Sequence, residues 1–217
     1  MIGLVVALLL AVIGVTSTEI YLRNRIEQCL AAGLRDELGA SVSVGLGARP
    51  VVYSLLDRRL PVLTVDSDDA RFGPAVGMEV HARLEEVSQP EGSDTAVVAG
   101  SEARVEWSAE SIEQTLGGIV TDVRTSADSG TVDVTALAGA VTVRLRPSVQ
   151  GGVIHIETVS TRGVPPQLTS EIVDLLARSL GGYPLELRPE SVTVTDAGIR
   201  VDLRGGTTSL PVSGGSC

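Results

Sequence analysis

Aromatic residues are nearly missing from this 217-residue chain: they make up 2% of it, with one Trp, one Phe and three Tyr. Hydrophobic residues nevertheless reach 43%, so a sizeable core can be buried, and that core must be aliphatic. The shortage also argues against a paired-carboxylate glycosidase site, because such sites usually lie among aromatic sugar platforms. Few aromatic anchors remain for sugars or bases.

Lysine is missing altogether, so that every basic side chain is an arginine. We attribute this to GC-rich codon usage rather than to phosphate recognition. The net charge is −10 and the isoelectric point is near 4.7. Nucleic acid is therefore excluded as a partner, because phosphate contacts need clustered cations.

The residues that carry most catalytic and metal chemistry are also scarce. His81 and His155 each fall on the polar phase of an alternating strand, and two cysteines alone cannot build a structural zinc site. No H-E-x-x-H, C-x-x-C, Walker or G-x-S-x-G motif occurs. The acidic run Asp66–Asp69 lacks the glycine and glutamate of a calcium loop, and we expect a solvated turn there. The sequence thus predicts no enzyme, no metal and no cofactor.

The first residues, MIGLVVALLLAVIGV, are almost wholly apolar, and no charge appears before Glu19. A membrane-spanning helix needs about 20 apolar residues and a signal peptide about 7–15, so residues 1–18 fit either a membrane anchor or a signal cleaved after Ser17. A buried helix of a cytosolic domain is the third alternative. We favour the signal-anchor, which places the rest of the chain on the extracytoplasmic, periplasmic side of the plasma membrane.

The two cysteines, Cys29 and Cys217, form an even count. In an exported protein this predicts a disulfide that joins the first helix to the Gly/Ser-rich C-terminal tail. Two unpaired thiols are the alternative.

Hydrophobic periodicity predicts an α+β domain over residues 19–205, followed by a tail at 206–217. Amphipathic helices are expected at 19–38, 108–119 and 165–180, with one or two helical turns at 51–56. Alternating residues and turn signals predict strands at 42–46, 60–65, 76–84, 95–107, 122–127, 131–137, 140–146, 153–159, 191–195 and 199–203.

The order of several segments is similar to one known family. In the second half these are Val164-Pro165-Pro166, the Leu168–Leu180 helix, Gly182-Tyr183-Pro184-Leu185-Glu186-Leu187 and the hairpin from Ser191 to Val201. In the first half they are the apolar start, a helix ending Leu34-Arg35-Asp36-Glu37-Leu38-Gly39, Arg49-Pro50 and the segment Arg59–Ala70. From about Glu19 to about Leu203, the chain resembles the LmeA-like phospholipid-binding family of actinobacterial cell envelopes.

The resemblance implies a long curved antiparallel sheet wrapped around amphipathic helices, as in tubular lipid-binding folds. It also implies a periplasm-facing protein that binds phospholipid and serves envelope glycolipid or mannan metabolism. No catalytic residues are implied.

On this hypothesis, acyl chains lie against aliphatic strand faces, and arginines at the rim meet the phosphate. The candidate acyl wall is Val80, Leu84, Val105, Trp107, Val134, Leu145, Ile156 and Leu176, with Arg83 and Arg144 as headgroup partners. The same residues would also suit an ordinary filled core. In that case the alternative is a scaffolding domain that docks an envelope biosynthetic enzyme at the membrane.

Overall fold

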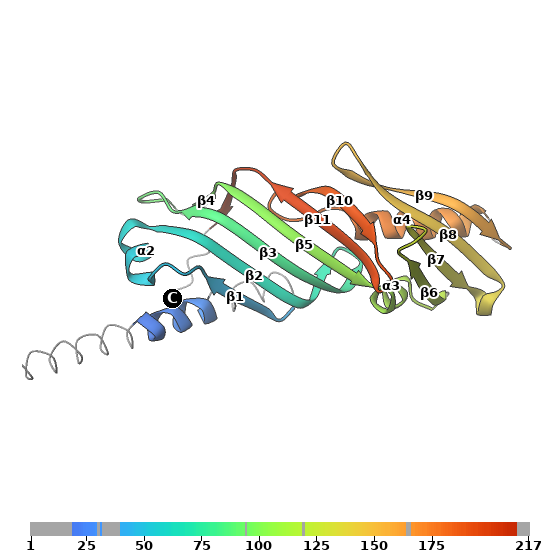
Figure 1. The fold of residues 1–217 in the computed structure, drawn as a ribbon, viewed down its shortest axis with the longest axis horizontal. Coiled ribbons are helices and arrows are strands. Elements are labelled where there is room, and N and C mark those ends of the chain that lie inside the picture. The colour runs from blue at the N-terminus through green and yellow to red at the C-terminus, as the bar shows by residue number, and fades with distance from the viewer. Residues whose placement is uncertain are drawn as a thin grey trace, which may run out of the picture.

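The computed structural model describes residues 19–29, 31, 40–93, 95–118, 120–163 and 166–211. It is helical at residues 19–29, and three further helices follow among the described residues: α2 (Val51–Asp57), α3 (Ala109–Leu116) and α4 (Pro166–Ser179). A 3-10 turn, η1, spans Leu137–Gly139. Antiparallel strands make up most of the remaining described chain, which confirms the predicted α+β class (Figure 1). The predicted apolar helix over residues 1–18 lies outside the described residues.

Two sheets lie along the length of the molecule (Figure 1). The first has the strand order β1-β2-β3-β5-β11-β10, and β4 pairs with both β3 and β12. Its strands are β1 (Val42–Leu46), β2 (Arg59–Phe72), β3 (Ala75–Ser88), β4 (Thr95–Val98), β5 (Gly100–Ser108), β10 (Arg188–Val194), β11 (Gly198–Gly205) and β12 (Thr208–Pro211). The second sheet is a meander of β6 (Val120–Ser126), β7 (Thr131–Ala136), β8 (Val141–Gln150) and β9 (Val153–Arg162).

The register of the first sheet sorts its side chains onto two unlike faces. Val80, Val105 and Val201 lie side by side across β3, β5 and β11. The residues next to these valines in sequence are polar or charged, and they too lie side by side, as Glu106 and Arg200 do. Because successive side chains point to opposite faces of a strand, one face of this sheet is apolar and the other is charged.

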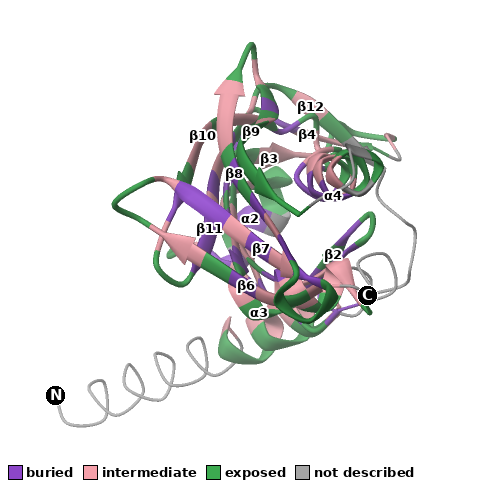
Figure 2. Cartoon of the chain, turned by 90° about the vertical axis from the view of Figure 1, so that its right-hand side faces the viewer, coloured by how far each residue is buried: buried purple, intermediate pink, exposed green. Residues whose placement is uncertain are grey.

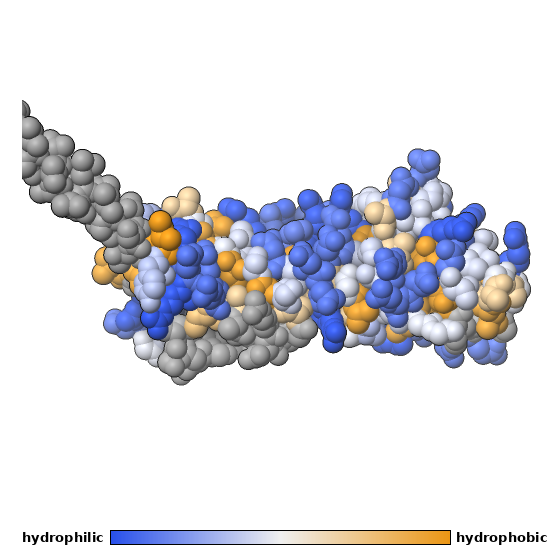
Figure 3. All heavy atoms as spheres, turned by 90° about the horizontal axis from the view of Figure 1, so that it is seen from below, coloured by the Kyte–Doolittle hydropathy of each residue, from blue (hydrophilic) through white to orange (hydrophobic). Residues whose placement is uncertain are grey.

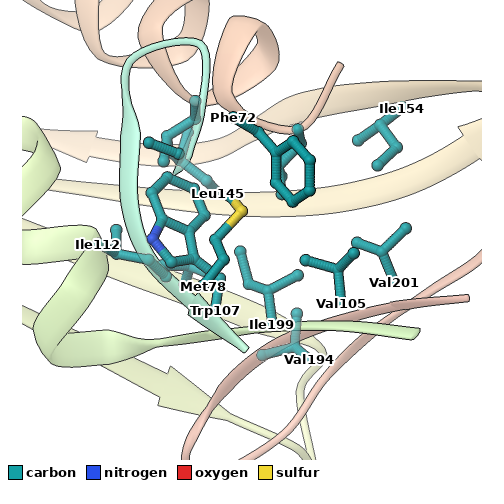
Figure 4. Close-up of a cluster of buried hydrophobic side chains, with 14 of the residues drawn as sticks. Phe72, Met78, Val105, Trp107, Ile112, Leu145, Ile154, Val194, Ile199 and Val201 are labelled. Carbon is teal, nitrogen blue, oxygen red and sulfur yellow. The ribbon is translucent and has the colours of Figure 1, made fainter. Parts of the chain in front are cut away.

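A large core joins the apolar face of the first sheet to the second sheet, α3 and α4. Trp107, Met78 and Leu145 lie at its centre, and the Trp107 indole N–H donates to the carbonyl of Val76 at 3.2 Å (Figure 4). Seen from the end of the second sheet, the buried residues lie mostly on strands and on α4, and the exposed ones lie on connecting loops and on the outward side of strands such as β9 (Figure 2). The predicted apolar face of α4 is confirmed at Ile172, Leu176 and the following Leu180.

A separate small core lies at the other end of the first sheet. It consists of Ala31, Val42, Val44, Leu46, Val51, Leu63, Leu84 and Val98. This core holds the helical residues 19–29 and Ala31, α2 and β1 against β2 and β3, and it contains no aromatic residue among the buried members described.

Several local expectations are confirmed. Ser108 begins α3, and its Oγ accepts a hydrogen bond from the backbone N–H of Ser111, as an N-cap does. The glycine turns at 128–130 and 150–152 connect β6 to β7 and β8 to β9. His81 and His155 are both exposed on strands, as predicted.

The acidic run Asp66–Asp69 is not a turn, contrary to the sequence prediction. Strand β2 continues through it to Phe72, and the pairing with β3 shifts register between Ser67 and Ala70. Asp66 points to the charged face, where its carboxylate meets His81 at 2.8 Å. Ala70 and Phe72 are then buried in the large core, which favours continuation of the strand.

Two other expectations differ from the structure. The single strand predicted over 95–107 is divided at Ala99 into β4 and β5, and β4 pairs along its whole length with β12 while touching β3 at Ser88 and Val97. Residues 208–211, which we assigned to the tail, form β12. The ordered domain therefore extends beyond residue 205, and residues 212–217 lie outside the described residues.

Gly198, the first residue of β11, leaves no room for a side chain against the backbone of β5. A Cβ added there would collide with the carbonyl oxygen of Trp107 and would lie 2.8 Å from the Cα of Ser108. We expect Gly198→Ala to lower the free energy of unfolding by about 1–3 kcal/mol, as overpacking does. Urea titration followed by circular dichroism measures the change. Gly206→Ala, which meets nothing within 4 Å, is the matched control and should stay within ~0.5 kcal/mol; equal losses in both variants would contradict the prediction.

Candidate functional site

The apolar face of the first sheet is not uniformly covered. Val65, Val80 and Ala82 lie on this face between the two cores, and all three are only partly buried. Val65 and Ala82 are direct neighbours across β2 and β3. We call these three residues the open strip. Apolar surface that stays accessible between two filled cores is where an apolar ligand would gain most from burial.

The segment after α4, residues 180–187, runs over the same face. Leu185 packs against both the large and the small core. Its carbonyl oxygen and the side chain of Leu187 would each lie 3.3 Å from a Cβ at Gly205, so the missing side chain lets the segment approach β11. Leu185 and Glu186 both have positive φ, at 60° and 54°. Such backbone costs about 1–2 kcal/mol per residue and persists only where packing enforces it.

Buried hydroxyl groups occur on this face without a protein partner. The hydroxyls of Ser101 and Tyr183 are buried and form no hydrogen bond. The Tyr183 ring packs edge-to-face on Phe72, with ring centroids 5.9 Å apart, and burial raises the pKa of the Tyr183 phenol. An unsatisfied buried hydroxyl costs roughly 1–3 kcal/mol. Each would gain a hydrogen bond from a polar atom of a ligand only after the residues that bury it move aside.

The opposite face of the sheet is neutralised by its own ion pairs. Arg104 bonds Asp202 at 3.0 Å, and Arg200 bonds Glu106 at 2.9 Å, both between β5 and β11. Arg204 lies 3.3 Å from Glu102 and 3.3 Å from Glu190. Arginines that are already paired make this face a poor site for a free anion.

Asp202 is the most connected carboxylate of that face. Partial burial by itself would raise its pKa, but hydrogen bonds from Arg104 and Ser191 and the charges of Arg104 and Arg200 outweigh it and lower the pKa overall. The ion pair therefore favours the folded state wherever this carboxylate is ionised.

No group of three or more His, Cys, Asp or Glu side chains within the described ranges could hold a metal ion. The two histidines lie on different sheets and are exposed. The described part of the chain contains no helix that is both long and apolar enough to cross a membrane.

A family model for LmeA-like phospholipid binding matches residues 17–204, which is most of the chain. The chain belongs to the LmeA-like phospholipid-binding family. The resemblance proposed from the order of segments is thus confirmed. No curated protein and no solved structure matches the chain.

Within this family member, six of the eight candidate acyl-wall residues lie in filled cores. Leu84 belongs to the small core, and Val105, Trp107, Val134, Leu145 and Leu176 belong to the large core, each at most 4% exposed. Val80 and Ile156 are only partly buried at the edge of the large core, and Val80 is part of the open strip. None of these assignments has been tested against a ligand, so the acyl wall stays a prediction.

Two residues of the open strip were missed by the sequence prediction. Val65 was the last residue of the predicted strand, because a turn was expected at Asp66, so the continuation of the strand was not foreseen. Ala82 was recognised as part of an alternating strand, but its small size gave no reason to choose it over its neighbours. Alternation does not show which part of an apolar face stays uncovered.

The two predicted headgroup arginines point away from the apolar face. Arg83 lies 3.2 Å from Glu85, and Arg144 forms two hydrogen bonds of 2.7 Å with Asp133. The hydrogen bond and the charge of Asp133 raise the pKa of Arg144. A headgroup role for either residue stays a prediction, and it would require the existing pair to open.

Of the two cysteines in the predicted disulfide, only Cys29 is among the described residues. The described residues include no free cysteine, so Cys29 is not a free thiol. Its predicted partner Cys217 lies outside the described residues, and the Cys29–Cys217 pair stays a prediction.

We expect Asp202→Asn to destabilise the protein at pH 7 and not in acid. Because the folded-state pKa is lowered from its ordinary value of 3.8, the stabilisation is present above that value and is lost as pH falls through the folded pKa. The loss at pH 7 should be below about 1 kcal/mol, since the pair is partly exposed and screened. Urea unfolding at pH 7 and well below pH 3.8 measures it. Asp68→Asn, an exposed carboxylate outside any ion pair, is the control; a difference that persists in acid would contradict the assignment.

Proposed function

We propose that this protein is a non-enzymatic phospholipid-binding protein of the cell envelope that holds acyl chains against the apolar face of its first sheet. The observation that carries the proposal is the open strip: apolar residues remain accessible between two filled cores in a chain whose family is defined by phospholipid binding. The wall is aliphatic throughout the strip, which suits acyl chains better than planar ligands.

The physical gain comes from removing methylene groups from water. Each buried CH₂ contributes about 0.8 kcal/mol, so a chain segment of a few carbons along Val65, Val80 and Ala82 gives useful affinity. The unpartnered hydroxyls of Ser101 and Tyr183 lie on the same side of the sheet, and they would donate to the ester oxygens of the glycerol backbone once the residues that bury them move aside. Both kinds of contact belong to the apolar face rather than to the charged one.

In this proposal residues 1–18 either anchor the chain in the plasma membrane or direct its export as a signal that is then cleaved, and in both cases the domain works on the extracytoplasmic side. The apolar segment that precedes Glu19 supports this location. The protein would serve envelope lipid or glycolipid metabolism together with an envelope biosynthetic protein.

The experiment that tests the proposed function is native mass spectrometry with lipid extraction. The chain from Glu19 onward is purified without detergent and then incubated with phospholipid vesicles. We expect about one phospholipid per protein. An unchanged apo mass after incubation would overturn the proposal and favour a scaffolding domain.

Filling the open strip should remove the lipid. Ala82→Phe places a large ring between Val65 and Val80, and we expect the lipid-bound peak to fall severalfold in the native mass spectrum. Because Ala82 is partly exposed, the fold should tolerate the ring. Glu79→Phe puts the same side chain on the opposite face of β3, where Glu79 is exposed, and should leave binding unchanged. Full binding by Ala82→Phe would place the lipid elsewhere on the protein.

A substitution of Arg144 distinguishes a headgroup-binding role from a purely structural role as the partner of Asp133. Its guanidinium is already bonded twice to Asp133, so we expect Arg144→Gln to leave the lipid-bound fraction unaltered. Arg124→Gln, an exposed arginine of the same sheet, is the control. A selective loss of bound phospholipid in Arg144→Gln would restore the headgroup role.

A further inference from the structure

Four large apolar or aromatic side chains are exposed together at the end of the molecule where the described chain begins. Leu56 is 78% exposed, Tyr21 63%, Ile20 60% and Tyr53 59%. They lie on the helical segment 19–29 and on α2, which are neighbours at the left of Figure 1. Figure 3 shows hydrophobic residues at this end, among others spread along the same face. We call these four residues the end patch.

The two elements that carry the end patch are held together by hydrogen bonds. The Glu19 carboxylate accepts from the backbone N–H of Val51 at 2.5 Å. The Arg23 guanidinium donates to the carbonyls of Leu46, Gly47 and Arg49 at 2.7, 3.0 and 3.2 Å. Val51 itself is buried in the small core. The end patch is therefore a preformed surface rather than a set of independent side chains.

The charge around the end patch differs from that of the whole chain. Residues 19–29 and 49–59 contain five arginines against three carboxylates, a formal charge of +2 in a chain of net charge −10. The guanidinium groups of Arg25 and Arg59 are paired with no carboxylate within the described ranges. A depression of about 510 Å³ at Leu56 is lined by Arg58 and Arg59 and also by the carboxylates of Asp57 and Glu91. Cations beside exposed apolar residues are the pattern that anionic lipid surfaces attract.

The sequence brings the end patch close to the apolar N-terminal segment. Val15 precedes Ile20 by five residues, which span at most about 17 Å even when fully extended. Tyrosine rings are favoured at membrane–water interfaces because they have an apolar body and a polar tip. The end patch has two of the three tyrosines of the chain, Tyr21 and Tyr53.

We propose that the end patch docks onto the surface of an anionic phospholipid bilayer. Ile20 and Leu56 enter the boundary between headgroups and acyl chains, the two tyrosine rings lie at headgroup level, and Arg25 and Arg59 meet lipid phosphates. The small core then lies nearest the bilayer and the second sheet farthest from it. This docking surface lies on the described domain, so it is separate from lipid binding at the open strip and does not depend on it.

The test uses the full chain and two single-tryptophan additions at exposed positions. Leu56→Trp places the reporter in the end patch, and Val159→Trp, 41% exposed on β9, places it at the opposite end. The native Trp107 is buried, and the wild-type signal is subtracted as background. Vesicles combine phosphatidylglycerol with phosphatidylcholine whose acyl chains are brominated, so that a tryptophan in contact with them loses fluorescence.

We expect L56W emission to shift to the blue and to be quenched about twofold or more, since an interfacial side chain lies roughly 5–10 Å into the boundary. V159W emission should stay unchanged. Quenching of L56W alone supports the docking surface, whatever the native mass spectrum shows for the open strip. Unquenched L56W, or equal quenching of both variants, would overturn it. Urea midpoints equal to that of the wild type confirm that both variants are folded.

Discussion

The pairing of β3, β5 and β11 is the constraint on which the rest of this structure depends. Its register places Val80, Val105 and Val201 on one face and alternating arginines and carboxylates on the other. A slip of one residue would exchange the two faces, burying ion pairs and exposing aliphatic side chains. The cores, the open strip and the neutralised outer face all follow from this single alignment.

The shortage of aromatic residues has a structural counterpart. The few rings present are used where one large side chain must join several elements: Trp107 lies at the centre of the large core, and Phe72 and Tyr183 connect β2 to the segment after α4. Elsewhere Val, Leu, Ile and Ala fill the space. An aliphatic face of this kind has little shape selectivity, which is compatible with a ligand whose apolar part is a flexible chain.

Much of the fold was predictable because its signals are local. Alternation identified most strands, glycine turns separated β6 from β7 and β8 from β9, and Ser108 marked the start of α3. The wrong predictions concern segments whose structure depends on residues far away in the chain. Nothing near Thr208 indicates that it pairs with Val98, and the acidic run after Val65 is typical of a turn unless His81 lies opposite it. For the site, alternation showed which face is apolar but not that the second sheet, the helices and residues 180–187 pack against much of it. Six predicted wall residues were therefore placed in filled cores.

The pairing of β5 with β11 also restricts when this protein can fold. Arg104 and Asp202, which meet across β5 and β11, are 98 residues apart in the chain, and Glu106 and Arg200 are 94 apart. Contacts at such separation require a large loop to close first, which slows folding. The first sheet therefore lacks β11 and β10, on one side of β5, until almost the last strand has been made. A chain that crosses a membrane before folding, as we propose, would benefit from this delay, because an incomplete sheet leaves it extended enough to be threaded through a translocation channel.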